Sequence, residues 1–234
     1  MISFSQRSTQ KELMDDLECS GEELNQTLRE LKTINRWLGG NHVTTKGIQQ
    51  LIKDKGQESY KIVDIGCGGG DMLRVISDWA EMNEIPLELE GVDANPNTIQ
   101  LAKTRLSDKP SIVLSIQNVF DQDFKKEKAD IVTCTLFTHH FTDEELVELL
   151  QVFKEKASLG IVINDLHRHP FAYYSIQTLT RFFSKSRMVR NDAPLSVLRS
   201  FKRQDWQRIL EKAGINNYSL RWFWAFRWQL LISV

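Results

Sequence analysis

The first clear pattern in the chain is an apolar stripe at helical spacing, which predicts an amphipathic helix near the start. Its members are Leu24, Leu28, Leu31, Ile34 and Leu38. The stretch SGEE at 20–23 matches a capping box at the helix start, and Gly39 with Gly40 supplies a stop. A stripe of this kind has to pack on another element of the protein.

From residue 61 onward, short apolar runs alternate with helical patterns. The apolar runs predict strands at 61–65, 87–92, 111–116, 129–137 and 159–164. Between them, helices are predicted at 71–82, 95–106 and 142–156, the last two opening with Asn95-Pro96 and with the capping box TDEE. This alternation implies a parallel sheet with right-handed crossovers and helices on both faces.

The tail of the chain breaks this rhythm. No clear strand lies in 165–202, a helix is predicted at 203–213, and the runs 218–224 and 228–234 predict a closing hairpin. The expected fold is therefore a Rossmann-like α/β sheet of seven strands, mostly parallel with a C-terminal antiparallel hairpin. We expect a helical cap or lid at 1–56, the main domain at 57–234, and a helical substrate insertion at about 166–202.

Composition and cysteine usage narrow the class of protein. With 234 residues, 41% of them hydrophobic, and a net charge of -1, the chain can bury one sizeable core. Cys19, Cys67 and Cys134 form no CxxC pair, so neither a disulfide framework nor a zinc cluster is indicated. Neither a signal peptide nor a long apolar run is evident, and we expect a soluble, cytoplasmic protein.

The stretch KIVDIGCGGGDM at 61–72 is the main candidate for a ligand site. Its glycines follow the first predicted strand, where open α/β sheets bind ligands, and the next helix offers free N–H groups to an anionic ligand. The NAD fingerprint fails because the sixth residue from Gly66 is Asp71, and no Gly-Lys-Ser/Thr of a phosphate loop follows. A nucleotide-like ligand is expected, and a glycine-rich turn without a ligand is the alternative.

The run D-I-G-C-G-G-G-D at 64–71 resembles motif I of the class I S-adenosylmethionine-dependent methyltransferases, and the resemblance covers roughly 57–165. It implies S-adenosylmethionine as cofactor. Asp93, which ends the second predicted strand, would accept both ribose hydroxyls, with a solvated loop acid as the alternative. Asn118 stands where the family usually has an acid facing the adenine amino group; Asp121 would replace it only in a differently arranged loop. The full set of expected cofactor contacts is Asp64, Gly66, Gly68, Gly70, Asp93, Ala94, Asn118, Val119 and Thr135.

The run ADIVTCTLFTHHFTDEE at 129–145 resembles motif IV of the same family. Its HHFTDE segment is similar to HDWSDE of plant O-methyltransferases, which implies His139 as catalytic base and His140 as a substrate contact. The double histidine also resembles ubiquinone-type C-methyltransferases, where it is not generally the base, so a packing role for His139 stays open. His167, in NDLHRHPF, is a weaker candidate base. No metal site is predicted, because the spaced acids of a magnesium-dependent enzyme are not evident.

The segment LRELKTINRWLGGN resembles the start of small bacterial methyltransferases associated with type III polyketide synthase products. It implies O-methylation of a phenolic or enolic polyketide, with Arg36 and Trp37 as substrate contacts in a lid. C- or N-methylation of a quinone, lipid or other metabolite is the alternative reaction. A non-catalytic partner protein that binds S-adenosylmethionine is the alternative of a different class.

Basic and aromatic residues alternate between residues 168 and 203. Three interpretations of this segment remain open. It could form a lid over a large apolar substrate, it could bind an acidic carrier or an anionic lipid surface, or it could bind RNA. A simple solvated helix face is the commonest origin of such charges. The near-neutral net charge and the absence of an Asn/Asp-Pro-Pro-Tyr motif after the fourth strand make nucleic acid an unlikely partner. The oligomeric state is not predicted.

Overall fold

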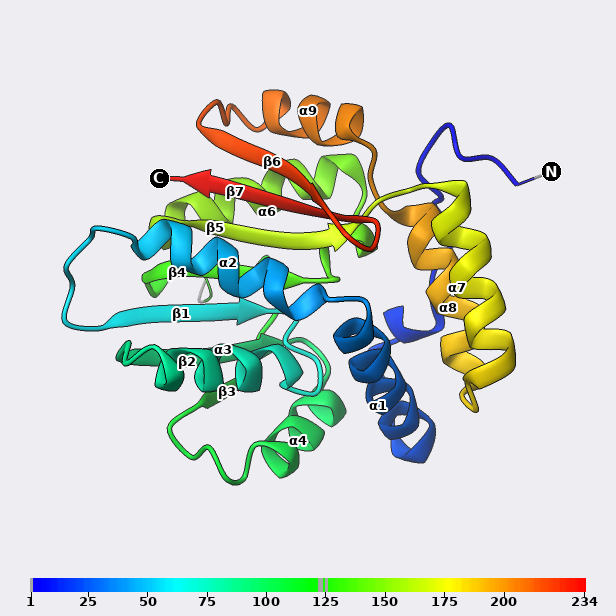
Figure 1. Cartoon of the computed structure of the whole chain (residues 1–234), viewed down its shortest axis with the longest axis horizontal. Helices are drawn as coiled ribbons and strands as arrows, with labels where there is room; N and C mark the ends of the chain where they lie inside the picture. Colours follow the sequence, from blue (N-terminus) through cyan, green and yellow to red (C-terminus); the bar gives the residue numbers. More distant parts are fainter. Residues whose placement is uncertain (1, 122–123, 125) are drawn as a thin grey trace.

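The computed structural model describes residues 2–121, 124 and 126–234. One seven-stranded sheet runs through it in the order β3-β2-β1-β4-β5-β7-β6 (Figure 1). The strands are β1 (Tyr60–Ile65), β2 (Leu87–Asp93), β3 (Val113–Ile116), β4 (Ala129–Thr135), β5 (Ala157–Leu166), β6 (Tyr218–Phe223) and β7 (Arg227–Ser233). The first five are parallel, and β7 pairs antiparallel with both β5 and β6. The predicted sheet with its closing hairpin is confirmed.

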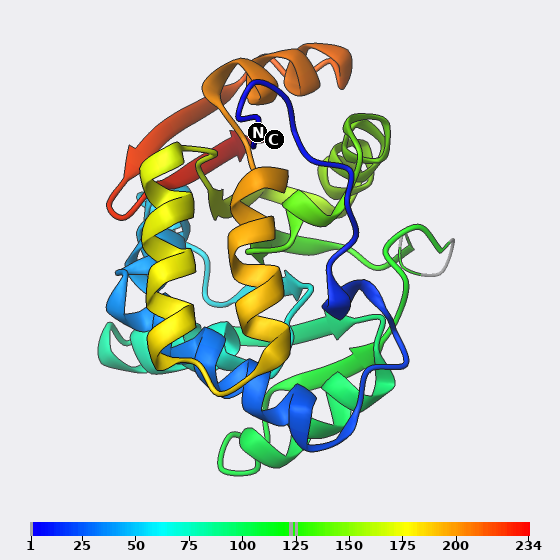
Figure 2. The same ribbon diagram turned by 90° about the vertical axis from the view of Figure 1, so that its right-hand side faces the viewer.

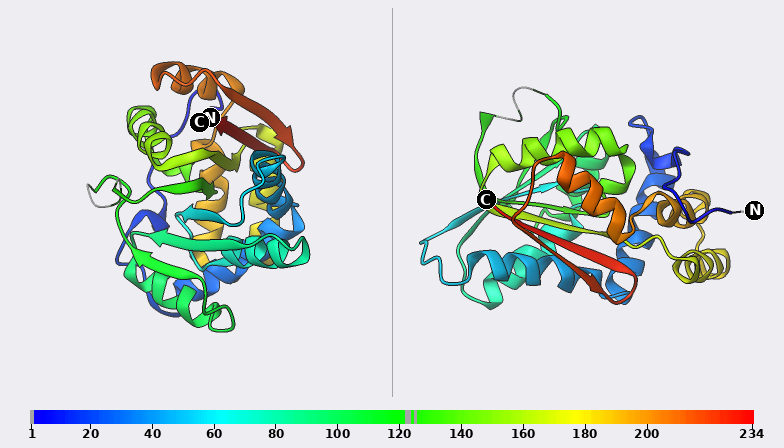
Figure 3. Two further views of the ribbon diagram at one scale, coloured as in Figure 1. Left: turned by 90° about the vertical axis from the view of Figure 1, so that its left-hand side faces the viewer. Right: turned by 90° about the horizontal axis from the view of Figure 1, so that it is seen from above.

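Helices cover both faces of the sheet (Figure 3). On one face, α6 (Asp143–Lys156) and α9 (Arg203–Lys212) bury Phe153 and Trp206 in a core shared with β4, β5 and β7. On the other face, α2 (Gly40–Ile52), α3 (Asp71–Met82) and α4 (Pro96–Arg105) contribute to a second core cluster. The two clusters hold the sheet between them, so the carboxyl ends of the parallel strands form a rigid edge.

The helix α2 is absent from the sequence prediction. The first predicted helix, α1 (Gly21–Trp37), ends as expected, and Gly39 turns the chain with φ 70°. The chain then enters a second helix at once and buries Val43, Ile48 and Leu51. A side chain at Gly47 would meet Cγ1 of Val162 at 2.5 Å, so α2 lies very close to β5. Part of the predicted cap at 1–56 is thus a layer of the main domain.

The remaining helices stand beyond the carboxyl ends of the strands (Figure 2). The predicted insertion consists of α7 (Pro170–Phe183) and α8 (Arg187–Arg199), which pack side by side. A segment that we call the N-terminal strap, residues 4–19, runs along α8 and includes the short 3-10 helix η1 (Leu13–Asp15). Backbone N–H groups of Leu13 and Met14 donate to the carboxylate of Asp192 on α8. These hydrogen bonds hold the strap in place, so that it covers the carboxyl ends of the strands from the side opposite the sheet.

Local capping agrees in part with the sequence. Asn95 accepts hydrogen bonds from the N–H groups of Asn97 and Thr98, and Thr142 forms a complete capping box with Glu145. Ser20, by contrast, makes no side-chain hydrogen bond at the start of α1. The strand β4 ends at Thr135, two residues earlier than predicted, because Leu136 takes a positive φ of 55° and begins a turn. Within the described residues, each helix falls short of the length and apolar content that a membrane span requires.

Candidate active site

The glycine turn after β1 forms one wall of a cavity of about 1060 Å³. Gly66 and Gly68 have φ values of 65° and 53°, which favour glycine, and α3 begins directly after the turn. A side chain at Gly66 would lie 2.2 Å from Cδ2 of Phe137, whereas a side chain at Gly68 would meet only Leu28 at 3.8 Å. The turn is therefore tightly packed from below and open toward the cavity.

Asp93 lies beside this turn at the end of β2. Its Oδ2 atom accepts a hydrogen bond from the N–H of Gly68 at 3.0 Å, and Oδ1 accepts one from Asn95 at 2.9 Å. Burial raises the pKa of the Asp93 carboxyl, while these hydrogen bonds oppose the shift. The side chain lines the cavity together with Ala94. Two backbone hydrogen bonds thus hold the Asp93 carboxylate in place on the cavity wall.

Asp64 and Thr135 lie at the ends of the two central strands. Asp64 is fully buried and accepts a hydrogen bond from Thr133 Oγ1 at 2.7 Å. Burial, as the main cause, raises the pKa of Asp64 to about 7. Thr135 shares a hydrogen bond of 2.9 Å with Thr44 of α2. Both residues line the cavity, so β1 and β4 contribute to its floor.

Asn118 and Val119 lie beyond β3 and line the opposite end of the cavity. The Asn118 side-chain oxygen accepts a hydrogen bond from the N–H of Phe120 at 3.1 Å. Val119 is buried in the hydrophobic core next to the cavity. Gly70, in contrast, lies outside the cavity lining and packs against Leu106 of the chain after α4. Of the nine expected cofactor contacts, Gly70 is the one that the structure keeps away from the cavity.

The motif IV histidine His139 lies in the short 3-10 helix η2 (Thr138–His140) and is almost completely buried. Its Nδ1 atom lies 2.7 Å from Oδ1 of Asp165 on β5. The other oxygen of Asp165 accepts from the His139 N–H and from Thr138 Oγ1. Burial alone would raise the pKa of Asp165, but the interactions with His139 and Thr138 lower it to about 2. Asp165 therefore stays ionised and fixes the orientation of the imidazole ring.

Glu12, on the N-terminal strap, faces the other side of the same imidazole. Its Oε1 atom lies 3.6 Å from His139 Nε2 and, among the described residues, has no hydrogen-bond partner. The second oxygen accepts from Ser196 on α8. Burial is the main cause that raises the pKa of Glu12 to about 7. Nothing in the sequence pattern pointed to Glu12, because its partners lie far along the chain.

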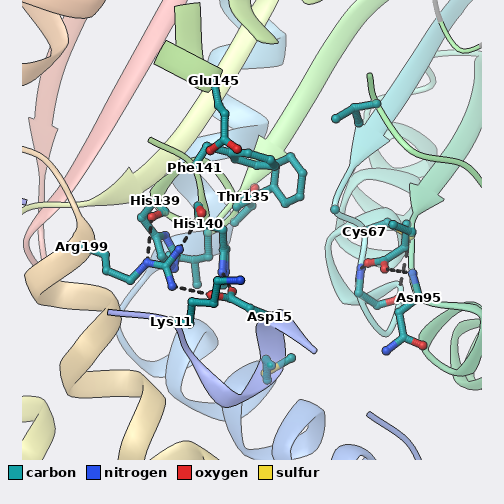
Figure 4. A pocket seen from close by; sticks show the side chains of 18 of the residues that line it. Lys11, Asp15, Cys67, Asn95, Thr135, His139, His140, Phe141, Glu145 and Arg199 are labelled. Atoms are coloured by element: carbon teal, nitrogen blue, oxygen red, sulfur yellow. Dashed lines mark hydrogen bonds and ion pairs between the residues drawn. The ribbon is translucent and has the colours of Figure 1, made fainter. Parts of the chain in front are cut away.

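His140 is held by a second carboxylate of the strap. Its Nδ1 atom lies 2.5 Å from Oδ1 of Asp15, and its ring lies over the His139 ring with centroids 4.3 Å apart. Arg199 of α8 bonds the other oxygen of Asp15 and donates to the carbonyls of His139 and His140. Burial would raise the pKa of Asp15, but His140 and Arg199 hold it well below its usual range. These contacts connect the strap, α8 and the histidine pair (Figure 4).

Arg7 anchors the strap to the loop that carries the histidines. It pairs with Asp143 at 2.8 Å and donates to the backbone carbonyl oxygens of Phe141 and Arg199. Its guanidinium also lies 4.4 Å from the ring centre of Phe201. The strap is thereby part of the cavity wall, which the sequence analysis did not anticipate.

Three predicted site residues lie elsewhere. Arg36 and Trp37 are not part of the cavity wall, and Trp37 is 74% exposed. The reason is helical phase: α1 faces the cavity with the side that carries Leu28, Leu31 and Asn35, and residues 36 and 37 lie off that side. The prediction of a substrate contact there is not supported by this geometry.

His167 is also remote from the cavity. Its Nδ1 atom accepts a hydrogen bond from the Trp222 indole at 3.2 Å, and its ring packs against Trp228. Burial, as the main cause, lowers the pKa of His167 to about 4. The loop after β5 turns toward the β6–β7 hairpin, because the backbone N–H of His167 bonds the carbonyl of Phe226. This removes His167 from the set of candidate bases.

Glu12, His139 and His140 are close enough to be considered as metal ligands. One ligand atom of each lies within 4.8 Å of the other two. However, the Arg199 Nε atom lies 3.7 Å from Glu12 Oε1 and already supplies a positive charge beside that carboxylate. We therefore interpret the arrangement as buried carboxyl groups that pair with a guanidinium and two imidazoles.

Comparisons with known proteins agree with this fold. Residues 62–160 match a family model described as a methyltransferase domain. A ribosomal protein L11 methyltransferase from Acetivibrio thermocellus is 29% identical over 105 residues, which cover 44% of this chain and 32% of that protein. A demethylmenaquinone methyltransferase from Thermotoga maritima is 29% identical over 121 residues, which cover 50% of this chain and 48% of that protein. The chain spans less than half the length of either curated relative.

Among solved structures, the plantazolicin methyltransferase in complex with SAH (S-adenosylhomocysteine) is similar in fold. It superposes with a TM-score of 0.64 at 20% identity, and the match covers 89% of this chain and 87% of that one. The two chains therefore share a fold. Residues 62–160, the part of the chain that matches the methyltransferase family model, hold the glycine turn, Asp93 and the histidine pair.

Proposed function

We propose that this protein is an S-adenosylmethionine-dependent methyltransferase that acts on an oxygen of a small, largely apolar acceptor. One observation carries the proposal: the same cavity is lined by the glycine turn, by Asp93 and by His139. The turn and Asp93 suit the amino-acid and ribose parts of the cofactor. When bound, the cofactor supplies an activated methyl group, so the protein has mainly to align the acceptor with it.

We propose His139 as the base. Ionised Asp165 holds Nδ1, so Nε2, which lies 3.6 Å from Glu12 Oε1, is the ring nitrogen that would take up a proton. The glycine turn and Asp93 would hold the cofactor, which would supply its activated methyl group to the acceptor oxygen, and the hydroxyl proton would pass to His139 Nε2. Because a phenol has a pKa of about 10, a positioned base aids its attack at neutral pH.

The acceptor class is inferred from the walls around the histidines. Apolar side chains from the strap, α1 and the motif IV loop line the same cavity: Met14, Leu17, Leu24, Leu28, Phe137 and Phe141. These side chains suit an aromatic or alkyl group of the acceptor. A phenolic or polyketide-type acceptor meets both requirements, an apolar body and an ionisable hydroxyl.

Methylation of carbon or nitrogen in a quinone, lipid or other metabolite is the second candidate reaction. The name of the Thermotoga maritima relative, a demethylmenaquinone methyltransferase, favours a quinone within that group. A non-catalytic S-adenosylmethionine-binding protein is the candidate of a different class. Buried His139 with its oriented Nδ1 favours catalysis, since a pure binder needs no base.

The first test is calorimetric titration of the protein with S-adenosylmethionine and with S-adenosylhomocysteine, with NAD as the control ligand. We expect both adenosyl ligands to bind and NAD not to bind. Asp93→Ala should weaken binding about 10-fold or more, because each charge-assisted hydrogen bond contributes about 1.5 to 3 kcal/mol. Asp108→Ala, which removes an exposed acid paired with Arg74, is the matched control.

A screen of phenols, enols and quinones with labelled cofactor then separates the three candidates. Label on oxygen supports the proposal, and label on carbon or nitrogen supports the second reaction. Cofactor binding without transfer to any acceptor supports the non-catalytic protein. Absence of binding by both adenosyl ligands contradicts the proposed function as a whole.

A further inference from the structure

Three segments of the chain lack acidic residues altogether. Residues 31–53, 166–191 and 212–234 contain no Asp or Glu, although the chain has 31 acids in total. All 31 acids therefore lie in the remaining residues, although the net charge of the whole chain is only -1. The protein therefore has a strongly asymmetric charge distribution, which total charge conceals.

The three acid-free segments come together in the fold. The backbone N–H of Ala225, in the β6–β7 turn, donates to the carbonyl of Leu38 at the end of α1. The Phe226 ring of the same turn packs against Phe171 at the start of α7, with centroids 5.8 Å apart. Lys46 of α2 lies 5.4 Å from the ring centre of Phe223 on β6. We call the exposed residues within 36–39, 171–190 and 221–226 the acid-free face; the ribbon of these segments can be followed in Figures 1 and 2.

Large aromatic side chains project from the acid-free face into solvent. Their exposed fractions range from 45% for Trp222 to 77% for Phe183. The set consists of Trp37, Phe171, Tyr174, Phe182, Phe183, Trp222 and Trp224. On α7, residues 171, 174, 178 and 182 share one side of the helix, so its exposed surface is a continuous stripe. An apolar surface of this extent indicates an interaction site.

Basic side chains lie on the same stretches of chain. The exposed ones within 36–39, 171–190 and 221–226 are Arg36, Arg181, Lys185, Arg187, Arg190 and Arg221. Glu30 adjoins the edge of this face, where its carboxylate is bonded by the Ser184 hydroxyl and the Lys185 N–H. Asp192, the next acid after α7, is buried and bonded to the strap. The partner should therefore be anionic and should accept apolar side chains.

We propose that the acid-free face docks on the surface of an anionic phospholipid bilayer. Tryptophans with basic neighbours are suited to the headgroup region, where the rings enter the interface and the cations meet lipid phosphates. The two phenylalanines at the end of α7, Phe182 and Phe183, have no polar atoms and favour insertion into lipid over stacking on a base. A second copy of the chain fits less well, because a two-fold contact would bring these cations together.

The inference is independent of methyl transfer, so its test uses neither cofactor nor acceptor. The full chain is sedimented with vesicles of phosphatidylcholine alone and of phosphatidylcholine mixed with phosphatidylglycerol. We expect binding to the anionic vesicles, reduced by added salt, with a blue shift of tryptophan emission. Equal binding to both vesicle types, or binding to neither, overturns the proposal.

Paired variants test whether this face is responsible. Arg181→Gln with Arg187→Gln should lower partition into anionic vesicles about 30-fold, from about 1 kcal/mol for each charge. Lys103→Gln with Lys154→Gln removes two exposed charges on α4 and α6 and should have little effect. Phe182→Ser with Phe183→Ser should also weaken binding, while leaving the charge unchanged.

Two further measurements distinguish other occupants of the face. If sedimentation velocity shows self-association that Phe182→Ser with Phe183→Ser abolishes, a second copy covers the face and the lipid proposal is wrong. Stronger binding to an RNA homopolymer than to anionic vesicles would assign the face to nucleic acid instead. A monomer that prefers the vesicles supports the proposal.

Discussion

The Nδ1 atom of His139 lies 2.7 Å from the Oδ1 atom of Asp165, and both side chains are almost completely buried. The two residues come from different strands: His139 follows β4, and Asp165 lies near the end of β5. Parallel pairing of these strands brings their carboxyl ends together. The sheet thus builds an oriented imidazole beside the cavity without any help from sequence proximity.

This relationship predicts the behaviour of two variants. His139→Ala should lower turnover about 100-fold or more and leave S-adenosylmethionine affinity unchanged, because it removes the proposed base but no cofactor contact. Asp165→Asn keeps the size of the side chain but loses the charge that fixes the ring, so turnover should also fall. The measurement is kcat, KM and cofactor Kd with the acceptor found in the screen. A rise in acceptor KM at unchanged kcat would make His139 a binding residue.

Two glycines with the same left-handed backbone conformation should differ in how much stability an added side chain costs. Gly66 and Gly56 have φ values of 65° and 64°, but only Gly66 has atoms of another side chain in the way, those of Phe137. Gly56→Ala should cost about 1 to 2 kcal/mol for the left-handed backbone alone. Gly66→Ala should cost more and weaken cofactor binding. Urea unfolding of both variants measures this, and equal losses of stability would contradict the packing described for Gly66.

Glu12 predicts a pH dependence of stability. Because its folded pKa is raised from 4.5 to about 7, the folded state holds a proton that the unfolded chain has lost. Through this group, the unfolding free energy should therefore fall as pH rises from about 4.5 to about 7. Its surroundings include His139, His140, Arg199 and Asp192, which remain in the variant.

Glu12→Gln removes this contribution. The difference in unfolding free energy, variant minus native chain, should therefore increase as pH rises from 5 to 7. The sign follows from the raised pKa of Glu12. Urea unfolding at several pH values measures the difference. Parallel profiles for the two proteins would show that Glu12 titrates normally.

Metal removal is expected to have no effect on methyl transfer. The Arg199 guanidinium beside Glu12 already supplies positive charge to the Glu12, His139 and His140 cluster. After dialysis against a chelator, we expect unchanged turnover and cofactor affinity. Loss of activity that zinc or another divalent cation restores would instead identify the cluster as a metal centre, and Glu12→Gln should then lower metal affinity.

The sequence by itself determined the sheet and one end of the site. Short apolar runs separated by helical patterns predict parallel strands, and the glycines of KIVDIGCGGGDM mark the turn at the carboxyl end of β1. Asp93 could be named because it ends a predicted strand at that edge, and His139 because the segment around it resembles a family motif. These are local signals, carried by residues a few positions apart.

The tertiary structure decided which distant residues complete the site. Glu12 and Asp15 reach the histidine pair only because Arg7 and the Asp192 carboxylate hold the strap against α8 and the motif IV loop. Trp37 is kept out of the cavity by the helical phase of α1. The acid-free face likewise arises from three segments that no local pattern relates. Contacts of this kind depend on how the elements pack together, so the periodicity of residues along the chain does not predict them.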